Sequence, residues 1–488
     1  MSESHTSPIT GRRVLVNTGA LAGSSIWRIL ISFVLQVLIT RVLGVAQFGQ
    51  YVSALAFLNV AQIASELGLP NLLVRDLAQN PTERRSYFQV ALAIQLLSAL
   101  ATWAVLILLS FVLPLSPGLR VALRLAGASL PFYAVTSVCQ TLFQAGERME
   151  LVMLVEGMIN LLIAGLSIAV LFQGGQVEHL IGVMVITQAV SAVLCLYLTW
   201  RTHLLTGNGK LSINLAQLWR EARPFYWLSL ADVLLHRLDI LLLNVVTGDY
   251  LTGLYSIAYS LVRVVVKLIQ SYWKALYPTL SRLRHESARH YRRLADLSLR
   301  YGLMVVLPGA ALTVGVAAPV LTLLYGVDAE ASGATLQILV WMTPFFLLET
   351  YAITLLMADH APGRSLFLTC LHIAAVILLL PWLTRGWGAP GAAAAMVVAS
   401  AFGAAAGLGL LHRRGLPIHV SKLGFLLIAT GVGGLLNYFL PGSWLVRTVI
   451  SALAYLVIIG VTGVFAVSDR DLLRRTLRVA QRSPVVDV

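Results

Sequence analysis

Charged residues are scarce in this chain of 488 residues, and their scarcity excludes a soluble protein. Only 11% of the residues are Asp, Glu, Lys or Arg, whereas 58% are hydrophobic. A soluble globular chain carries about a quarter charged residues. Apolar stretches of about twenty residues recur along almost the whole sequence, and each can cross a hydrocarbon layer of roughly 30 Å. The composition therefore predicts an all-α, polytopic membrane protein with about fourteen transmembrane helices.

Cysteine is also rare. Cys139, Cys195 and Cys370 lie far apart in the sequence, and each falls within a predicted span. Their spacing fits neither a metal site nor a disulfide framework, so we interpret them as small apolar packing residues. The sequence also lacks paired carboxylates, a nucleophile elbow and metal-ligand clusters. We therefore expect a protein that is not an enzyme and that needs no metal or other cofactor.

Acidic residues are outnumbered by basic ones, 21 to 35, which gives a formal net charge of +14. If the N-terminus is cytoplasmic, most Lys and Arg residues fall on the cytoplasmic side, as the positive-inside rule expects. The sequence thus predicts a multi-pass protein of the inner (cytoplasmic) membrane with both termini cytoplasmic. We interpret the basic excess as a topology signal with some attraction to anionic membrane lipids, and we expect no nucleic-acid partner.

The predicted spans are separated by short loops and helix breakers. They lie near residues 18–40, 49–69, 87–112, 119–144, 150–173, 177–200, 223–246, 251–275, 299–323, 334–357, 362–384, 388–411, 421–440 and 443–467. Pro278 and the glycines between Gly386 and Gly391 are among the predicted helix breaks. Two longer polar segments, 201–222 and 278–300, are predicted to be cytoplasmic loops.

One internal repeat divides the chain. The pattern Gly44-x4-Gly49-x-Tyr51-x2-Ala54 returns 204 residues later as Gly248-x4-Gly253-x-Tyr255-x2-Ala258. Six predicted spans separate the copies, so the halves face the same way, as in transporters built from two pseudo-twofold six-helix bundles with the substrate between them. The predicted parts are an N-terminal lobe (1–205), a C-terminal lobe (206–416), an additional helix pair (417–468) and a basic cytoplasmic tail (469–488).

Ionisable residues recur inside the predicted spans, where each costs roughly 2.5–3.5 kcal/mol on insertion scales. In the eighth span three basic residues share one helix face with a glutamine at i, i+4, i+7 and i+11: Arg263, Lys267, Gln270 and Lys274. In the seventh span one face carries Asp232, His236 and Asp239. Other charges in the spans include Arg237 in the seventh, which points away from that face, Arg28 in the first, Glu66 in the second, and two acids that we interpret as isolated, Glu156 and Glu349.

Two interpretations of these charges stay open. In the structural one, Asp232 or Asp239 pairs with Arg263 or Lys267 and holds neighbouring helices together. In the functional one, the bases bind an anionic headgroup, and the acids tune charge or carry a coupling ion. Lone histidines such as His236 and His372 are interpreted as packed and neutral.

Two segments resemble a known family. "TRVLGVAQFGQYVSALAFL" followed by "ELGLPNLLVRDLA" resembles the N-terminal signature of polysaccharide-biosynthesis flippases. The matching positions are Arg41, Leu43, Gly44, Phe48, Gly49, Tyr51, Leu67, Gly68, Arg75, Asp76, Leu77 and Ala78. In the second half, "HRLDILLLNVVTGDYLTGLYSIAYSLV" matches the family at Asp239, Gly253, Tyr255, Ser256 and Ala258, and "YPTLSRL" follows. The resemblance covers roughly residues 15 to 415.

This resemblance implies a flippase of lipid-linked oligosaccharides within the multidrug, oligosaccharidyl-lipid and polysaccharide exporter superfamily. The implied substrate is a polyprenyl-diphosphate oligosaccharide for O-antigen, exopolysaccharide or capsule, with a polysaccharide polymerase as a further expected partner. In the family a cationic central cavity is lined by the first, second, seventh and eighth helices. It implies headgroup binding by Arg28, Arg263 and Lys267, and the helix face adds Lys274; Glu66, Asp232 and Asp239 are the candidates for ion coupling or charge pairing.

Three alternatives remain. A drug or cation exporter of the same superfamily would favour an acidic, aromatic cavity, and the cationic stripe argues against it. A glycan polymerase or ligase would need a long outward catalytic loop, and none is predicted. A scaffold for glycan assembly would not need buried charge.

Overall fold

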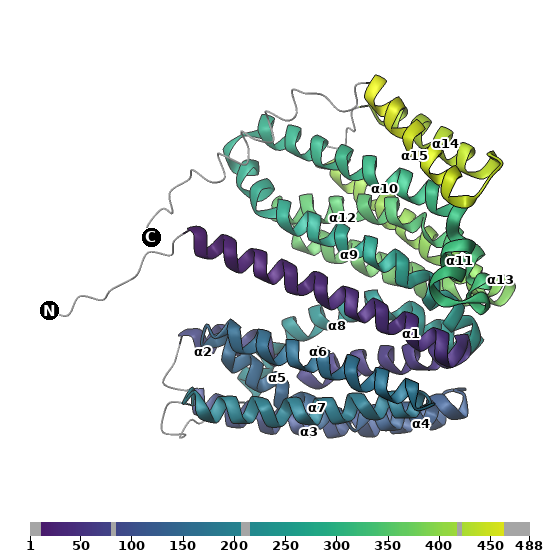
Figure 1. The fold of residues 1–488 in the computed structure, drawn as a ribbon. Helices are drawn as coiled ribbons and strands as arrows, with labels where there is room; N and C mark the ends of the chain where they lie inside the picture. Colours follow the sequence, from purple (N-terminus) through teal and green to yellow (C-terminus); the bar gives the residue numbers. More distant parts are fainter. Residues whose placement is uncertain (1–10, 80–83, 206–214, 417–421, 463–488) are drawn as a thin grey trace. The chain divides into compact units, whose positions relative to one another are not determined.

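The computed structural model describes residues 11–79, 84–205, 215–416 and 422–462, with the backbone alone for 11–30, 78, 79 and 215. Over these ranges the chain forms helices and no strand, so the all-α prediction is confirmed (Figure 1). The predicted tail, 469–488, lies outside the described residues.

The helices of Figure 1 follow one another with short connections. They are α1 (Gly11–Glu66), α2 (Leu69–Gln79), α3 (Arg84–Val112), α4 (Pro117–Gly127), α5 (Leu130–Ala145), α6 (Met149–Phe172), α7 (Val177–Arg201), α8 (Leu215–Thr247), α9 (Asp249–Glu286), α10 (Ala288–Tyr325), the 3-10 helix η2 (Val327–Ser332), α11 (Gly333–Leu339), α12 (Met342–Ala358), α13 (Pro362–Arg413), α14 (Leu423–Phe439) and α15 (Trp444–Val461).

The predicted spans lie on these helices. α1 and α13 each hold two spans, separated by non-helical backbone at Gly44 and Gly388. By length and hydropathy, eight described helices can cross a membrane, or ten if α4–α5 and η2/α11–α12, bent by 41° and 42°, each count as one span. Neither α8 nor the 17-residue α14 is among these eight helices. Much of the exposed surface is apolar, as lipid contact requires.

One predicted helix break is wrong. Pro278 lies inside α9, and α10 begins two residues after α9 ends, so 278–300 is helical rather than a loop. Proline removes one backbone donor, but its fixed φ is compatible with a helix, so the chain continues through it. The two helices separate at Ser287, where the backbone is extended. The Ser287 hydroxyl caps α10 by accepting a hydrogen bond from the His290 N–H.

The internal repeat has a structural counterpart. Gly44 (φ 79°, ψ 173°) and Gly248 (φ 80°, ψ −172°) share a backbone conformation that is essentially limited to glycine. Each glycine separates two helical segments, and in both copies the tyrosine seven residues later is buried, as Tyr51 and Tyr255. The sequence pattern therefore repeats a specific break between helices.

The described chain forms two compact units. The first contains the described parts of Met1–Tyr51, Ala61–Val112 and Pro117–Trp227; the second contains Val52–Val60, Leu113–Ser116 and the described parts of Leu228–Val488. The lobe boundary at 205/206 remains a prediction.

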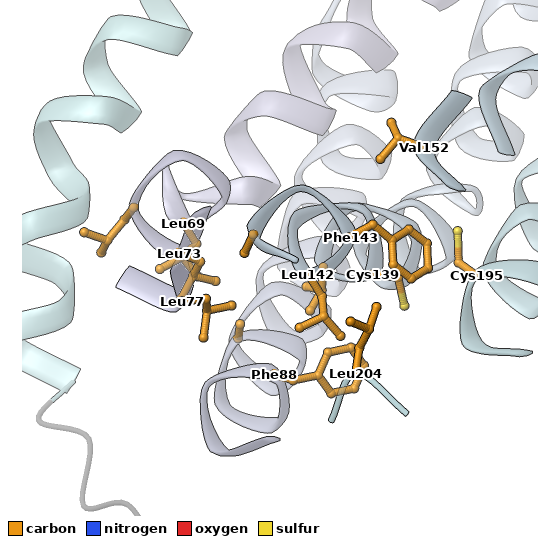
Figure 2. Packing of buried hydrophobic residues seen from close by; sticks show 14 of the residues in the cluster. Leu69, Leu73, Leu77, Phe88, Cys139, Leu142, Phe143, Val152, Cys195 and Leu204 are labelled. Atoms are coloured by element: carbon orange, nitrogen blue, oxygen red, sulfur yellow. The ribbon is translucent and has the colours of Figure 1, made fainter. Parts of the chain in front are cut away.

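A buried cluster packs α2, α3, α5, α6 and α7 of the first unit together (Figure 2). Leu69, Leu73 and Leu77 lie on one face of α2, and Cys139 and Cys195 belong to the same core. These two cysteines are packing residues, as predicted. Cys370 on α13 is exposed, so that part of the prediction is wrong, because the residue lies on an outward face of its helix.

In the second unit, α14 and α15 pack beside each other and against α10 (Figure 1). Buried Asn437 joins them: its amide donates to the Leu312 carbonyl at 2.7 Å and accepts from the Thr448 hydroxyl at 3.3 Å. A Cβ at Gly315 would stand 2.4 Å from Asn437 Nδ2, so this contact requires a glycine on α10. The Tyr455 hydroxyl adds a bond to the Met304 carbonyl.

Candidate functional site

The predicted basic stripe lies on the most enclosed of the candidate spans. In the apolar stretch of 18 residues within α9, 67% of the residues are buried. This is a larger share than in any of the other seven long apolar helices of the described chain. Lys267 and Lys274 are nevertheless exposed, and Arg263 is half-buried. The two lysines therefore lie on an open part of α9, beyond its closely packed segment 252–260.

The polar face of α8 connects to this stripe through hydrogen bonds. The Lys267 ammonium donates to Gln270 Oε1 at 3.1 Å, and Gln270 Nε2 lies 2.9 Å from His236 Nε2. The other ring nitrogen of His236 lies 2.8 Å from the Asp232 carbonyl oxygen, while the exposed Asp232 carboxylate is 3.8 Å away. The interpretation of His236 as a lone histidine is wrong, because Gln270 of α9, 34 positions along the chain, is one of its hydrogen-bond partners.

Asp239 occupies a different environment from Asp232. It is 2% exposed, and its Oδ2 accepts a 2.7 Å hydrogen bond from the Tyr255 hydroxyl. Its Oδ1 is buried and has no side-chain hydrogen-bond partner among the described residues. Arg237 is the nearby base whose charge acts on it. Asp239 is thus held by a tyrosine of the repeat motif.

In the first unit, Glu66 has a similar arrangement. Its Oε1 accepts bonds from the Tyr133 hydroxyl at 2.7 Å and from the Ser137 hydroxyl at 3.2 Å, both on α5. Each unit therefore contains a carboxylate bound by a tyrosine hydroxyl. Arg28, the remaining predicted base, lies in the part of α1 whose side chains fall outside the described residues.

Glu349 and His372 form a pair that sequence reasoning missed. Nδ1 of His372 lies 3.0 and 3.1 Å from the two Glu349 carboxylate oxygens, and each side chain is 4% exposed. The interpretation of both residues as isolated is wrong. They lie 23 positions apart on different helices, so no local spacing in the sequence could reveal the contact.

One small pocket touches two of these groups. It is lined by Leu234, Leu235, Leu238 and Asp239 of α8 and by His372, Ile373, Val376 and Met396 of α13. The buried carboxylate and the paired histidine therefore face a common, mainly apolar space.

Ion pairs outside the predicted spans hold helix ends together. Arg75, from the signature segment, bridges Asp76 and Glu221 at 2.8 and 2.9 Å. In the second unit Asp359 accepts from Arg284 and Arg414. Partial burial opposes ionisation of Asp359, but the hydrogen bonds and positive charges of the two arginines hold its pKa below the usual range. These pairs tie α2 to α8 and α9 to α13.

Comparisons with known proteins show what this chain is similar to. A curated relative, the "Probable flippase AglR" of Haloferax volcanii, is 24% identical over 415 residues, which are 82% of this chain and 83% of that protein. The fold is similar to that of the lipid II flippase MurJ in an inward closed conformation, with TM-score 0.72, 12% identity and coverage of 93% of this chain and 99% of that one.

An inward-facing multidrug resistance transporter of the MATE family, within the MOP superfamily, is also similar. Its TM-score is 0.63 at 12% identity, and the match covers 79% of this chain and 94% of that chain. At these identities the structural likenesses show the fold alone. The family described as "Polysaccharide biosynthesis protein" matches residues 14–284. The chain belongs to this family of polysaccharide biosynthesis proteins.

Proposed function

We propose that this protein is a flippase that moves a polyprenyl-diphosphate-linked oligosaccharide from the cytoplasmic to the outer leaflet by alternating access. The family and the name of the curated relative support transport of a lipid-linked sugar. The observation that carries the proposal is the basic stripe of α9, whose two lysines are exposed beyond the closely packed segment 252–260.

The stripe fits a diphosphate. Arg263 and Lys267 lie about 6 Å apart along one face of α9, a length that the acceptor oxygens of a diphosphate can span, and Lys274 follows about 10 Å further along that face. Charge-assisted hydrogen bonds to phosphate replace part of the water that these groups lose in the membrane. Arg28 is proposed to join them. The cargo binds without covalent chemistry, and its lipid chain stays in the bilayer.

The acids have a second proposed role, in ion coupling or charge balance. Asp232 is exposed beside His236, whereas Asp239 and Glu66 are held by tyrosine hydroxyls. We place the protein in the inner membrane with both termini cytoplasmic, where the assembly of O-antigen, exopolysaccharide or capsule supplies the cargo and a polysaccharide polymerase takes it up.

A drug or cation exporter is the second candidate, favoured by the likeness to the MATE fold. A cationic drug would be repelled by Lys267 and Lys274, which are both exposed on the open face of α9. The flippase function accounts for these charges, and an exporter of cations does not.

The test is transfer of a labelled polyprenyl-diphosphate oligosaccharide across proteoliposome membranes. We expect Arg263→Ala/Lys267→Ala to lower the transfer rate at least about tenfold, because two charge-assisted contacts at roughly 1.5–3 kcal/mol each are lost. The matched control is Arg289→Ala, which removes an exposed arginine at the start of α10. Transfer that survives the double substitution at wild-type rate would place the headgroup site elsewhere, and no protein-dependent transfer would contradict the function.

A further inference from the structure

The buried pair of Glu349 and His372 has no part in cargo binding as proposed above. Its carboxylate has room because Gly403 packs against it: a Cβ at that position would stand 2.6 Å from Oε1. Both side chains are almost fully enclosed by protein. Ionisable groups at membrane depth are costly, and they mark proton or ion pathways.

His372 and Asp239 both line the small pocket between α8 and α13. The Oδ1 atom of Asp239 is buried and has no side-chain hydrogen-bond partner among the residues that the structure describes. Leaving such an oxygen unsatisfied costs about 1–3 kcal/mol, more for a charged group, and a proton on it removes the charge. The pocket thus presents an imidazole that can give a proton and a carboxylate oxygen that can take one.

The charged and titratable groups around the pocket come from four helices. They are Asp239, His236 and Arg237 on α8, Tyr255, Tyr259 and Arg263 on α9, Glu349 on α12 and His372 on α13. Arginine and tyrosine keep one charge state near neutral pH. His236 is engaged by Gln270 and by the Asp232 backbone. The titratable groups that line the pocket, or that pair with a residue lining it, are therefore His372 with its partner Glu349, and Asp239.

We infer that transport is coupled to protons, and that His372, which is paired with Glu349 and shares a pocket with Asp239, is where the proton is bound and released. This inference rests on the proposed flippase function. In the loaded state the pair holds one proton, as imidazolium and carboxylate. On release the Nε2–H bond breaks and an O–H bond forms at Asp239 Oδ1 or at an entering water. The neutral imidazole regains a proton when the pocket opens to the other side.

One feature favours a proton over a metal cation. Both Glu349 oxygens face a ring nitrogen, whereas hard cations are held by several oxygen ligands. Asp239 and His372 belong to the same compact unit, whose part of α8 begins at Leu228. A displacement of α8 against α13 within this unit would open the pocket and couple its protonation to the cycle.

The experiment uses the full chain in proteoliposomes with the membrane potential clamped. Leaflet distribution of a labelled polyprenyl-diphosphate oligosaccharide is measured without a gradient, with a difference of one pH unit, and with a sodium gradient. Wild type should accumulate cargo on one side up to about tenfold under the pH difference, the limit for one proton per cargo. His372→Gln and Glu349→Gln should each still exchange cargo without a gradient but lose the accumulation. The control Asp359→Asn, which breaks an acid–base cluster outside the spans, should keep it.

The outcomes separate the two proposals. No protein-dependent exchange would overturn the flippase function and the inference with it. Exchange that ignores the pH difference, or accumulation driven by sodium alone, would overturn only proton coupling. Accumulation that persists in both His372→Gln and Glu349→Gln would overturn the assignment to this pair. If one variant loses exchange in every condition, the other variant decides the assignment.

Discussion

At the scale of single residues, Gly68 shows what the signature segment does for the fold. It follows α1 with φ +73°, and a Cβ there would stand 2.5 Å from the Tyr226 nitrogen and 2.6 Å from the Ala222 carbonyl oxygen. Both clashing atoms belong to the backbone of α8, which cannot rotate away as a side chain can. Glycine is therefore required for both conformation and space.

We expect Gly68→Ala to destabilise the protein by about 3 kcal/mol or more, since positive φ and overpacking each cost roughly 1–3 kcal/mol. The matched control is Gly157→Ala, at a helical position on α6 with no atom within 4 Å of the added Cβ. That variant should keep or slightly raise stability. Thermal unfolding in detergent measures both, and equal melting temperatures for the two variants would show that α8 does not pack on Gly68.

The residue scale also shows how far the sequence could predict the site. Spacing on one helix located the stripe of Arg263, Lys267 and Lys274, because i, i+4 positions share a face. The partners of buried acids could not be predicted: Glu66 meets Tyr133, 67 positions away, and Glu349 meets His372. Such contacts depend on how helices pack, which hydropathy does not encode.

At the scale of helices, the repeat supplies two breaks of the same geometry. Neither Gly44 nor Gly248 has an atom within 4 Å of an added Cβ, so a substitution there meets conformational strain without a clash. Gly44→Ala and Gly248→Ala should therefore each lower the free energy of unfolding by about 1–3 kcal/mol, and by similar amounts. Gly165→Ala on α6, where the added Cβ also meets open space, is the control. Unequal losses measured by chemical denaturation would mean that the two breaks do not bear equivalent strain.

Some helix boundaries could be predicted because a local residue marks them, and others could not. Gly44 and Gly248 were located from the sequence, because the conformation there needs glycine. The helix break predicted at Pro278 was wrong, because a proline inside a long helix costs a hydrogen bond but need not end the helix. The apolar stretches predicted the helices well, since a membrane leaves backbone groups no alternative partner.

For the whole molecule, the 204-residue shift places unlike charges at equivalent positions. Arg28 corresponds to Asp232, and Glu66 corresponds to Gln270. Asp239 corresponds to Leu35, which is buried and apolar. α1 has no break between residue 28 and Gly44, and α8 has none before Gly248, so the register holds. The two halves share their helix plan but differ in charge, and the bond between an acid and the motif tyrosine occurs at Tyr255 of the second half. A coupling site in that half alone fits this asymmetry.

The direction of transport depends on the orientation that the basic residues impose on the whole chain. With both termini cytoplasmic, the turn after α6 lies outside and the end of α9 lies inside. We expect Gln173→Cys to react with a membrane-impermeant maleimide added to intact cells, and Glu286→Cys to react only after the membrane is opened. Both positions are exposed, and a Cys370→Ala background removes the exposed native thiol while Cys139 and Cys195 stay buried. The reverse labelling pattern would place the Arg284–Asp359 end of the second unit outside, and cargo would then have to enter from the opposite end.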